Sequence, residues 1–153
     1  MPRPVTLAPR KDQEWRDPKG WTNVLAGIPI FAGLAPRHLR KVAGAARIQR
    51  FEANTVIMRA GEPGDDMHVL LDGDLAVRRP HLPDVALPVG SFVGELALLD
   101  DGPRTATVLA SGPVVTLTIT RARFRKLLLA EPSIALVIAQ ELARRLRSVQ
   151  AVS

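Results

Sequence analysis

Hydrophobic residues between positions 47 and 120 occur in short runs with a period of two, which is typical of β-strands. These runs are rich in β-branched residues and contain Ile48 and Phe51, 56–58, 68–71, 75–77, 85–87, 106–109 and 115–119. Turn residues separate them at 62–65, 72–73 and 111–113, and Asp72-Gly73 is a strong hairpin signal. The pattern predicts an antiparallel β sandwich or barrel.

Segments whose hydrophobic residues recur with a helical period flank this β region. On its N-terminal side, Thr22 is placed to cap a short helix that ends at Gly27. A second helix is predicted from Pro36, since proline suits a first helical turn, to Ala46. Its apolar positions are Leu39, Val42 and Ala43.

On the C-terminal side, residues 121–130 are predicted to form one helix, capped by Thr120, and Pro132 starts a longer one. The longer helix carries one apolar stripe, made of Ile134, Ile138, Leu142, Leu146 and Val149. Such a stripe packs on the β region or pairs with its copy in a homodimer.

The chain of 153 residues is long enough for one domain with a reasonable core. Residues 1–20 are rich in Pro, Arg, Lys and Asp without an apolar period, so they are predicted to be a flexible basic arm. Residues 21–153 form the predicted domain, with helices over 22–46, β-strands over 47–120 and helices over 121–150. Trp15 and Trp21 are expected to pack on the domain itself.

Composition narrows the class of protein. Hydrophobic residues make up 46% and aromatic ones only 4%, so the core should be aliphatic. The absence of cysteine excludes disulfides and thiol chemistry. No secretion signal follows Met1, and the most apolar stretch, 127–139, is too short to span a bilayer and contains Glu131 and Pro132. A cytoplasmic protein without a membrane span is expected.

A net charge of +6 attracts anionic partners in general. Its clusters are Arg121, Arg123, Arg125 and Lys126, and then Arg144, Arg145 and Arg147. A charge run on a helix is usually a solvated face, and the aromatic residues that stack on bases are scarce. Direct nucleic-acid binding is therefore not expected.

The titratable side chains show no catalytic or metal-binding pattern. His38 is placed on a polar helix face, His68 in a strand and His81 in a proline-flanked loop, and no pair has metal-ligand spacing. Each is expected to be structural. Since neither a nucleophile nor a metal site is evident, the protein is not expected to be an enzyme.

Residues 94–108 carry the most specific signal in the chain. Gly94 allows a ligand to approach the backbone, and residues 95–99 favour a short helical turn whose first N–H groups form an anion site. Gly102-Pro103 ends the turn, with Asp100 and Asp101 predicted to point into solvent. Arg104 supplies a planar, charged guanidinium whose N–H groups match phosphate oxygens. Glu95 is suited to a ribose 2′-OH, so the pair predicts a ligand with a phosphate and a sugar hydroxyl.

This segment resembles the phosphate-binding cassette of cyclic nucleotide-binding domains. The resemblance extends over about residues 22–148, through 30–34 with Leu39, the turns and strands of 61–77, and Phe124, Leu127, Leu128 and Pro132. It implies an antiparallel β-roll of about eight strands that contains the cassette at 94–106. Helices would precede the roll, and hinge and lid helices would follow it. Val93 departs from the phenylalanine that is common in the family.

The resemblance also implies a ligand, cAMP or cGMP, and a role for single residues. The implied ligand-binding residues are Gly94, Glu95, Leu96, Ala97, Arg104, Thr105 and Ala106. Arg104 would hold the cyclic phosphate and Glu95 the ribose 2′-OH, while backbone amides line the anion site. Threonine at position 105 slightly favours cGMP over cAMP as the expected ligand. The C-terminal helices would cover the base and transmit binding.

Two alternatives stay open. A ligand-free scaffold of the same fold would serve interaction or dimerisation, and Arg104 tied to Asp100 or Asp101 would favour it. In the second alternative, the chain is the regulatory fragment of a larger transcription regulator of the same family. Such regulators carry a helix-turn-helix after the lid helix, and none is evident before Ser153. The effector protein is not identifiable from the sequence.

Overall fold

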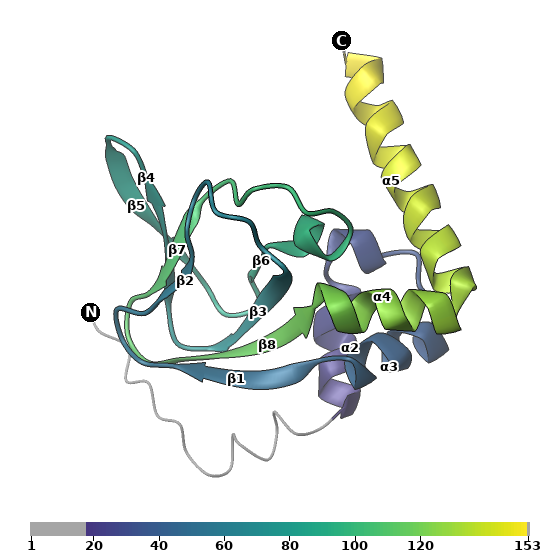
Figure 1. The fold of residues 1–153 in the computed structure, drawn as a ribbon, viewed down its shortest axis with the longest axis horizontal. Coiled ribbons are helices and arrows are strands. Elements are labelled where there is room, and N and C mark those ends of the chain that lie inside the picture. Colours follow the sequence, from purple (N-terminus) through teal and green to yellow (C-terminus); the bar gives the residue numbers. More distant parts are fainter. Residues whose placement is uncertain (1–17, 153) are drawn as a thin grey trace.

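A computed structural model describes residues 18–152 and begins with three helical segments (Figure 1). These are α2 (Pro18–Ala26), the 3-10 helix η1 (Pro29–Phe31) and α3 (Pro36–Gly44). Pro36 occupies the first turn of α3, and Leu39, Val42 and Ala43 are buried, as the sequence predicts. The predicted end at Ala46 is wrong by two residues, because the helix gives way to the first strand.

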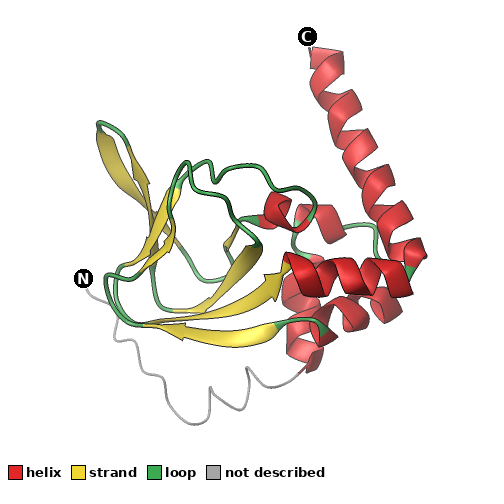
Figure 2. Ribbon diagram, viewed as in Figure 1, coloured by secondary structure: helices red, strands yellow, loops and turns green. Residues whose placement is uncertain are grey.

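Eight strands form two four-stranded antiparallel sheets, which confirms the predicted β-roll. They are β1 (Arg47–Phe51), β2 (Val56–Met58), β3 (Asp66–Asp72), β4 (Leu75–Arg79), β5 (Leu82–Leu87), β6 (Phe92–Val93), β7 (Thr107–Ala110) and β8 (Val114–Thr120). One sheet has the order β1-β8-β3-β6 and the other β2-β7-β4-β5. Figure 2 shows the helices gathered at one end of these sheets. The two-residue β6 was not predicted.

The two faces of the first sheet have different partners, because successive side chains of a strand point to opposite sides. Val69 and Leu117 belong to a hydrophobic cluster with the helices, where the rings of Phe31 and Phe124 lie 5.8 Å apart. Leu70, on the other face of β3, belongs to a second cluster with residues of β4 and β7. The outer face of this sheet therefore packs against the helices, and its inner face contributes to a separate hydrophobic interior of the roll.

The hairpin predicted at Asp72-Gly73 is wrong. β3 and β4 lie in different sheets, so this turn carries the chain from one sheet to the other. Gly73 has φ +94°, and a Cβ there would overlap the carbonyl of Pro113. The hairpin of this region instead joins β4 and β5 through Pro80-His81, with His81 at φ +60°.

Two predictions for the N-terminal helices need correction. Thr22 does not cap α2 but lies inside it, because Pro18 already provides a first turn. His38 is not on a polar face: it is buried, with Nε2 3.2 Å from Ser133 Oγ. Trp21 packs against the helical core as predicted, whereas Trp15 lies outside the described residues, as do residues 1–17 of the predicted arm.

The C-terminal helices are α4 (Arg121–Ala130) and α5 (Pro132–Val152). The predicted bounds of α4 are confirmed, and the Thr120 side chain accepts a hydrogen bond from the Arg123 amide as its cap. The stripe on α5 is buried at Ile134 and Ile138, yet Val149 is 69% exposed. Figure 1 shows why: α5 rises away from the roll. None of the helices described is both long enough and apolar enough to cross a membrane.

Candidate functional site

The segment after β6 forms the predicted helical turn. Gly94 has φ +79° and leads into the 3-10 helix η2 (Glu95–Leu98). The Ala97 amide donates to the Gly94 carbonyl at 3.0 Å, so the amides of Glu95 and Leu96 precede the first hydrogen bond of the turn. Ala97 and Leu98 are buried, whereas Leu96 is exposed. Burial on one side thus anchors the turn and leaves its first residues accessible.

The chain returns to this turn through a loop that is tied to the segment before β3. The Arg104 amide donates to the Glu62 carbonyl at 2.8 Å, and the Gly61 amide donates to the Arg104 carbonyl at 2.9 Å. Asp100 accepts a hydrogen bond from the Gly102 amide, and both Asp100 and Asp101 are exposed, as predicted. These bonds fix the backbone from which the Arg104 side chain projects.

The Arg104 guanidinium is held by Asp66 on β3. Its Nη1 donates to the Asp66 carbonyl at 2.7 Å, its Nη2 donates to Asp66 Oδ1, and the side chain is only 7% exposed. A Cβ placed on Gly64 or on Gly94 would overlap the guanidinium. Two glycines and one carboxylate therefore define the position of Arg104, and it is not tied to Asp100 or Asp101.

A cavity of about 380 Å³ opens beside the turn and the guanidinium. Its lining residues are Met58, Gly94, Glu95, Leu96, Ala97, Asp100, Gly102, Pro103, Arg104 and Thr105. The volume lies in the range of small-ligand pockets. The cavity brings together every predicted site residue except Ala106, which is half-buried before β7 and does not line it.

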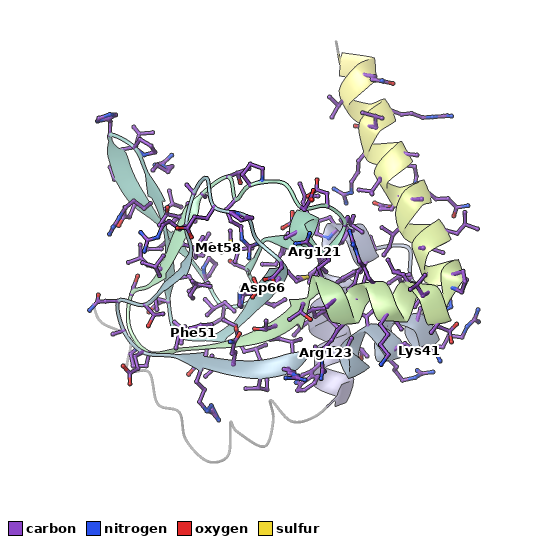
Figure 3. All side chains as sticks on the ribbon, viewed as in Figure 1. Lys41, Phe51, Met58, Asp66, Arg121 and Arg123 are labelled. Carbon is purple, nitrogen blue, oxygen red and sulfur yellow. The ribbon has the colours of Figure 1, made fainter. Side chains whose placement is uncertain are left out.

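Sequence reasoning missed three contributors to this site. Met58, labelled in Figure 3, reaches the cavity from β2, and no sequence signal distinguishes it from a core residue. Gly64 was identified only as part of a turn. Asp66 was not singled out from the pair Asp65-Asp66, and only the start of β3 determines which carboxylate faces Arg104.

The Asp66 carboxylate has a second partner, His68, whose Nε2 lies 3.2 Å from Asp66 Oδ1. Burial alone would raise the pKa of Asp66. The hydrogen bond and charge of His68, together with Arg104, outweigh burial and hold the pKa below its ordinary value of 3.8. Asp66 is therefore an anion at neutral pH, as a partner for Arg104 must be.

This lowered pKa predicts an acid-sensitive contribution to stability. A carboxyl whose pKa is depressed in the folded state stabilises the protein above the unfolded pKa and loses that contribution as pH falls through the folded pKa. We expect the melting temperature of the protein to exceed that of Asp66→Asn at pH about 5, and the difference to shrink below pH about 4. Thermal melts from pH about 5 to about 2.5 measure it. A difference that stays constant over this range would contradict the ion pair.

Metal binding finds no support in the part of the chain that the structure describes. No group of three or more His, Asp or Glu side chains there is arranged to hold a metal ion. The site instead offers one guanidinium, the carboxylates of Glu95 and Asp100, the backbone amides at the start of η2 and an aliphatic wall. This set of groups suits an anionic ligand that also carries hydroxyl and apolar parts.

Comparison with known families agrees with this chemistry. Residues 48–131 match the family model of the cyclic nucleotide-binding domain. Because the match covers more than half of the chain, the chain belongs to the cyclic nucleotide-binding domain family. The resemblance noted in the sequence is thereby confirmed.

One of the curated relatives is an ion channel. A cyclic nucleotide-gated potassium channel of Mesorhizobium japonicum is 38% identical over 117 residues, which cover 76% of this chain and 32% of the channel. The chain spans about a third or less of the length of the curated relatives it matches.

Solved structures show the same fold. The N-terminal domain of a transcriptional regulator from Streptomyces coelicolor A3(2) superimposes with a TM-score of 0.73 at 28% identity, over 84% of this chain and 94% of that one. The regulatory domain of Toxoplasma gondii PKA, solved with cAMP, gives a TM-score of 0.60 at 26% identity, over 88% and 52%.

Proposed function

We propose that this chain is a sensor domain that binds cAMP or cGMP in the cavity beside η2. The observation that carries the proposal is Arg104, which lines the cavity and whose buried guanidinium is held in place by Asp66. A cation that is kept inside a domain and faces an open cavity is suited to an anionic ligand. The related Toxoplasma gondii domain was solved with cAMP, which supports the choice of ligand.

The cyclic phosphate would lie between Arg104 and the start of η2. Asp66 engages Nη1 and Nη2, and the guanidinium has further N–H groups that can turn to phosphate oxygens. The amides of Glu95 and Leu96 supply uncharged donors next to it. The Ala106 amide, predicted to join them, does not line the cavity, so its role requires the loop to tighten around the ligand.

Glu95 would accept a hydrogen bond from the ribose 2′-OH. It lines the cavity and is half-buried, so part of its solvation is already lost. A hydrogen bond from a ligand hydroxyl to a carboxylate is stronger than a hydrogen bond between two neutral groups. Thr105 lines the same cavity with an exposed side chain, which keeps it in reach of the base and leaves the cAMP or cGMP preference open.

Binding would be transmitted through the junction between β3 and α4. Arg104 packs on Gly64, and the Gly64 carbonyl accepts a hydrogen bond from Arg121 at 2.9 Å. Arg121 begins α4 and, with Asp66, is labelled in Figure 3. A ligand that moves Arg104 would therefore act on the first turn of α4 and, through it, on α5.

Two further parts of the proposal concern α5. It carries exposed apolar side chains, namely Leu136 near its start and Leu146 and Val149 in its outer half. These would serve either as a lid that folds over the bound base or as a contact in a homodimer. Arg144 and Arg145 both reach Glu141, so these cations are partly neutralised within the helix.

Calorimetric titration with cAMP, cGMP and linear 5′-AMP tests the proposed function. We expect saturable binding of at least one cyclic nucleotide in the micromolar range or tighter, and weaker binding of 5′-AMP. The ratio of the two cyclic nucleotide affinities then determines the preference that Thr105 leaves open. Absence of both heat and thermal stabilisation with all three nucleotides would refute the proposal and favour a ligand-free scaffold.

We expect Glu95→Gln to weaken cAMP binding by about tenfold, because a charge-assisted hydrogen bond to the ribose becomes a neutral one. The same substitution should have little effect on binding of 2′-deoxy-cAMP, which lacks the hydroxyl. Affinities of both proteins for both nucleotides form a double-mutant cycle that isolates this contact. Equal losses for both nucleotides would remove Glu95 from the ribose site.

A further inference from the structure

We propose that a basic groove beside α4 binds an acidic segment of a partner protein. The basic groove consists of two hollows, of about 340 Å³ and about 280 Å³, that share Arg123 as a common wall. Neither hollow shares a lining residue with the ligand cavity. The inference therefore goes beyond nucleotide binding and adds a protein interaction surface.

The larger hollow lies between the end of α3 and one face of α4. Its lining residues are Lys41, Gly44 and Ala45 on the α3 side, and Arg123, Lys126, Leu127 and Ala130 on α4. The four positions on α4 are three or four residues apart in turn, so they share one face of the helix. Lys41 and Arg123 are labelled in Figure 3, on the same side of α4.

The smaller hollow continues the groove along the start of β1. It is lined by Arg47, Ile48 and Gln49 of β1, and by Asp66, Thr118, Thr120 and Arg123 on the other side. Because α3 leads directly into β1, residues 41–49 contribute to the walls of both hollows. A surface with this extent suits an extended chain segment better than a single small ion.

The groove presents positive charge that the fold leaves uncompensated. Lys41 pairs with Glu131 at 2.7 Å. The side chains of Arg47, Arg123 and Lys126 are exposed, and none of them has a hydrogen bond or ion pair with another residue in the described part of the chain. These three cations are therefore available to an anionic partner.

The two carboxylates close to these cations are already engaged. Asp66 lines the smaller hollow, but its carboxylate contacts Arg104 and His68. Glu131 is the partner of Lys41. In addition, Arg123 belongs to the first turn of α4, where the helix dipole adds positive potential. The electrostatics of the groove thus favour a negatively charged occupant.

The floor of the larger hollow favours a peptide among anionic occupants. Ala45, Leu127 and Ala130 provide apolar surface between the cations. This alternation is complementary to a segment in which acidic and apolar residues alternate. A flat bilayer surface would not fill concave hollows, and no lining residue of either hollow is aromatic, so the stacking that single-stranded nucleic acids use is missing.

The position of the groove suits an effector protein. Its occupant would touch both α3 and α4, and α4 begins at Arg121, which donates to the Gly64 carbonyl at 2.9 Å. A displacement of α4 relative to α3 would change the shape of the groove. This link to signalling rests on the proposed function, whereas peptide binding itself does not.

Fluorescence anisotropy with a labelled peptide of alternating Glu and Leu, at an ionic strength of about 0.15 M, tests the inference. We expect saturable binding in the micromolar range, and none of a peptide of alternating Lys and Leu. Arg123→Glu/Lys126→Glu should weaken binding at least about tenfold. Arg78→Glu/Arg79→Glu, on the exposed part of β4, changes the net charge equally and should retain the affinity.

Absence of saturable binding overturns the inference, and so does an equal loss in both double variants, because net charge alone would then explain it. Tighter binding to phosphatidylserine vesicles or to a single-stranded oligonucleotide, lost in the groove variant, overturns the assignment to a protein partner. If the groove variant does not fold, Arg123→Gln and Lys126→Gln replace it, each with an expected loss of about threefold.

A parallel titration with cAMP keeps the two proposals apart. The groove variant leaves the ligand cavity unaltered, so it should bind cAMP as the unaltered protein does. Peptide binding without cAMP binding would refute the proposed function alone. Binding of cAMP without peptide binding would refute the role of the groove alone.

Discussion

We expect Arg104→Ala to weaken cAMP binding by about 30-fold to several-thousand-fold. Truncating one partner of a desolvated charge pair costs about 2–5 kcal/mol, which converts to that range of affinity. The lower end applies if the amides of η2 retain part of the phosphate contact. The higher end applies if the uncompensated Asp66 carboxylate, close to the phosphate, then repels it.

Calorimetry or a fluorescent-nucleotide displacement assay measures this loss, with Arg78→Ala as the control. Arg78 lies on β4, is exposed and pairs with Asp84, so it shares the chemistry of Arg104 but not its site. The double variant Arg104→Ala/Asp66→Asn separates lost attraction from new repulsion, since it removes both charges. Arg104→Ala that binds as tightly as the unaltered protein would refute the phosphate assignment.

The cassette could be predicted from the sequence because its chemistry is local. Gly94, Glu95 and Arg104 lie within one short segment, and Gly102-Pro103 terminates the turn between them. The structure brings these residues to one cavity. Short-range spacing therefore predicted which side chains meet, and the family match supports the same fold.

The partner of Arg104 could not be predicted in this way. Asp66 is 38 residues away, and its contact depends on how β3 pairs with β8 and where the loop before β3 ends. The adjacent Asp65 is equally acidic in the sequence. Long-range register determines which of two neighbouring carboxylates faces Arg104, and register carries no local signal.

Tertiary packing also explains the two wrong predictions with the clearest physical cause. Asp72-Gly73 has hairpin chemistry, but Gly73 is required because the Pro113 carbonyl of the neighbouring connection lies against it. His38 has polar neighbours in α3, but the start of α5 docks on it through Ser133. In both cases a contact from a distant segment overrides a correct local preference.

The second large effect is expected at Gly94. With φ +79°, an alanine there is strained by about 1–2 kcal/mol. Its Cβ would also overlap the Arg104 guanidinium and lie 2.8 Å from the Asp66 carbonyl. We expect Gly94→Ala to lower the melting temperature and, in addition, to weaken cAMP binding at least about tenfold, because the guanidinium must leave its position.

Gly90→Ala separates backbone strain from displacement of the Arg104 guanidinium. Gly90 has φ +93°, so alanine is similarly strained there, but an added Cβ would meet no heavy atom within 4 Å. Both variants should lose stability in thermal melts from the strained backbone, and Gly94→Ala should lose more because its Cβ also overlaps the Arg104 guanidinium. Only Gly94→Ala should lose affinity for cAMP in a titration. Equal affinities for the two variants would mean that Arg104 can adjust without cost, and the glycine would then serve the turn alone. A selective loss would show that the left-handed residue before η2 is required to place the guanidinium against the ligand.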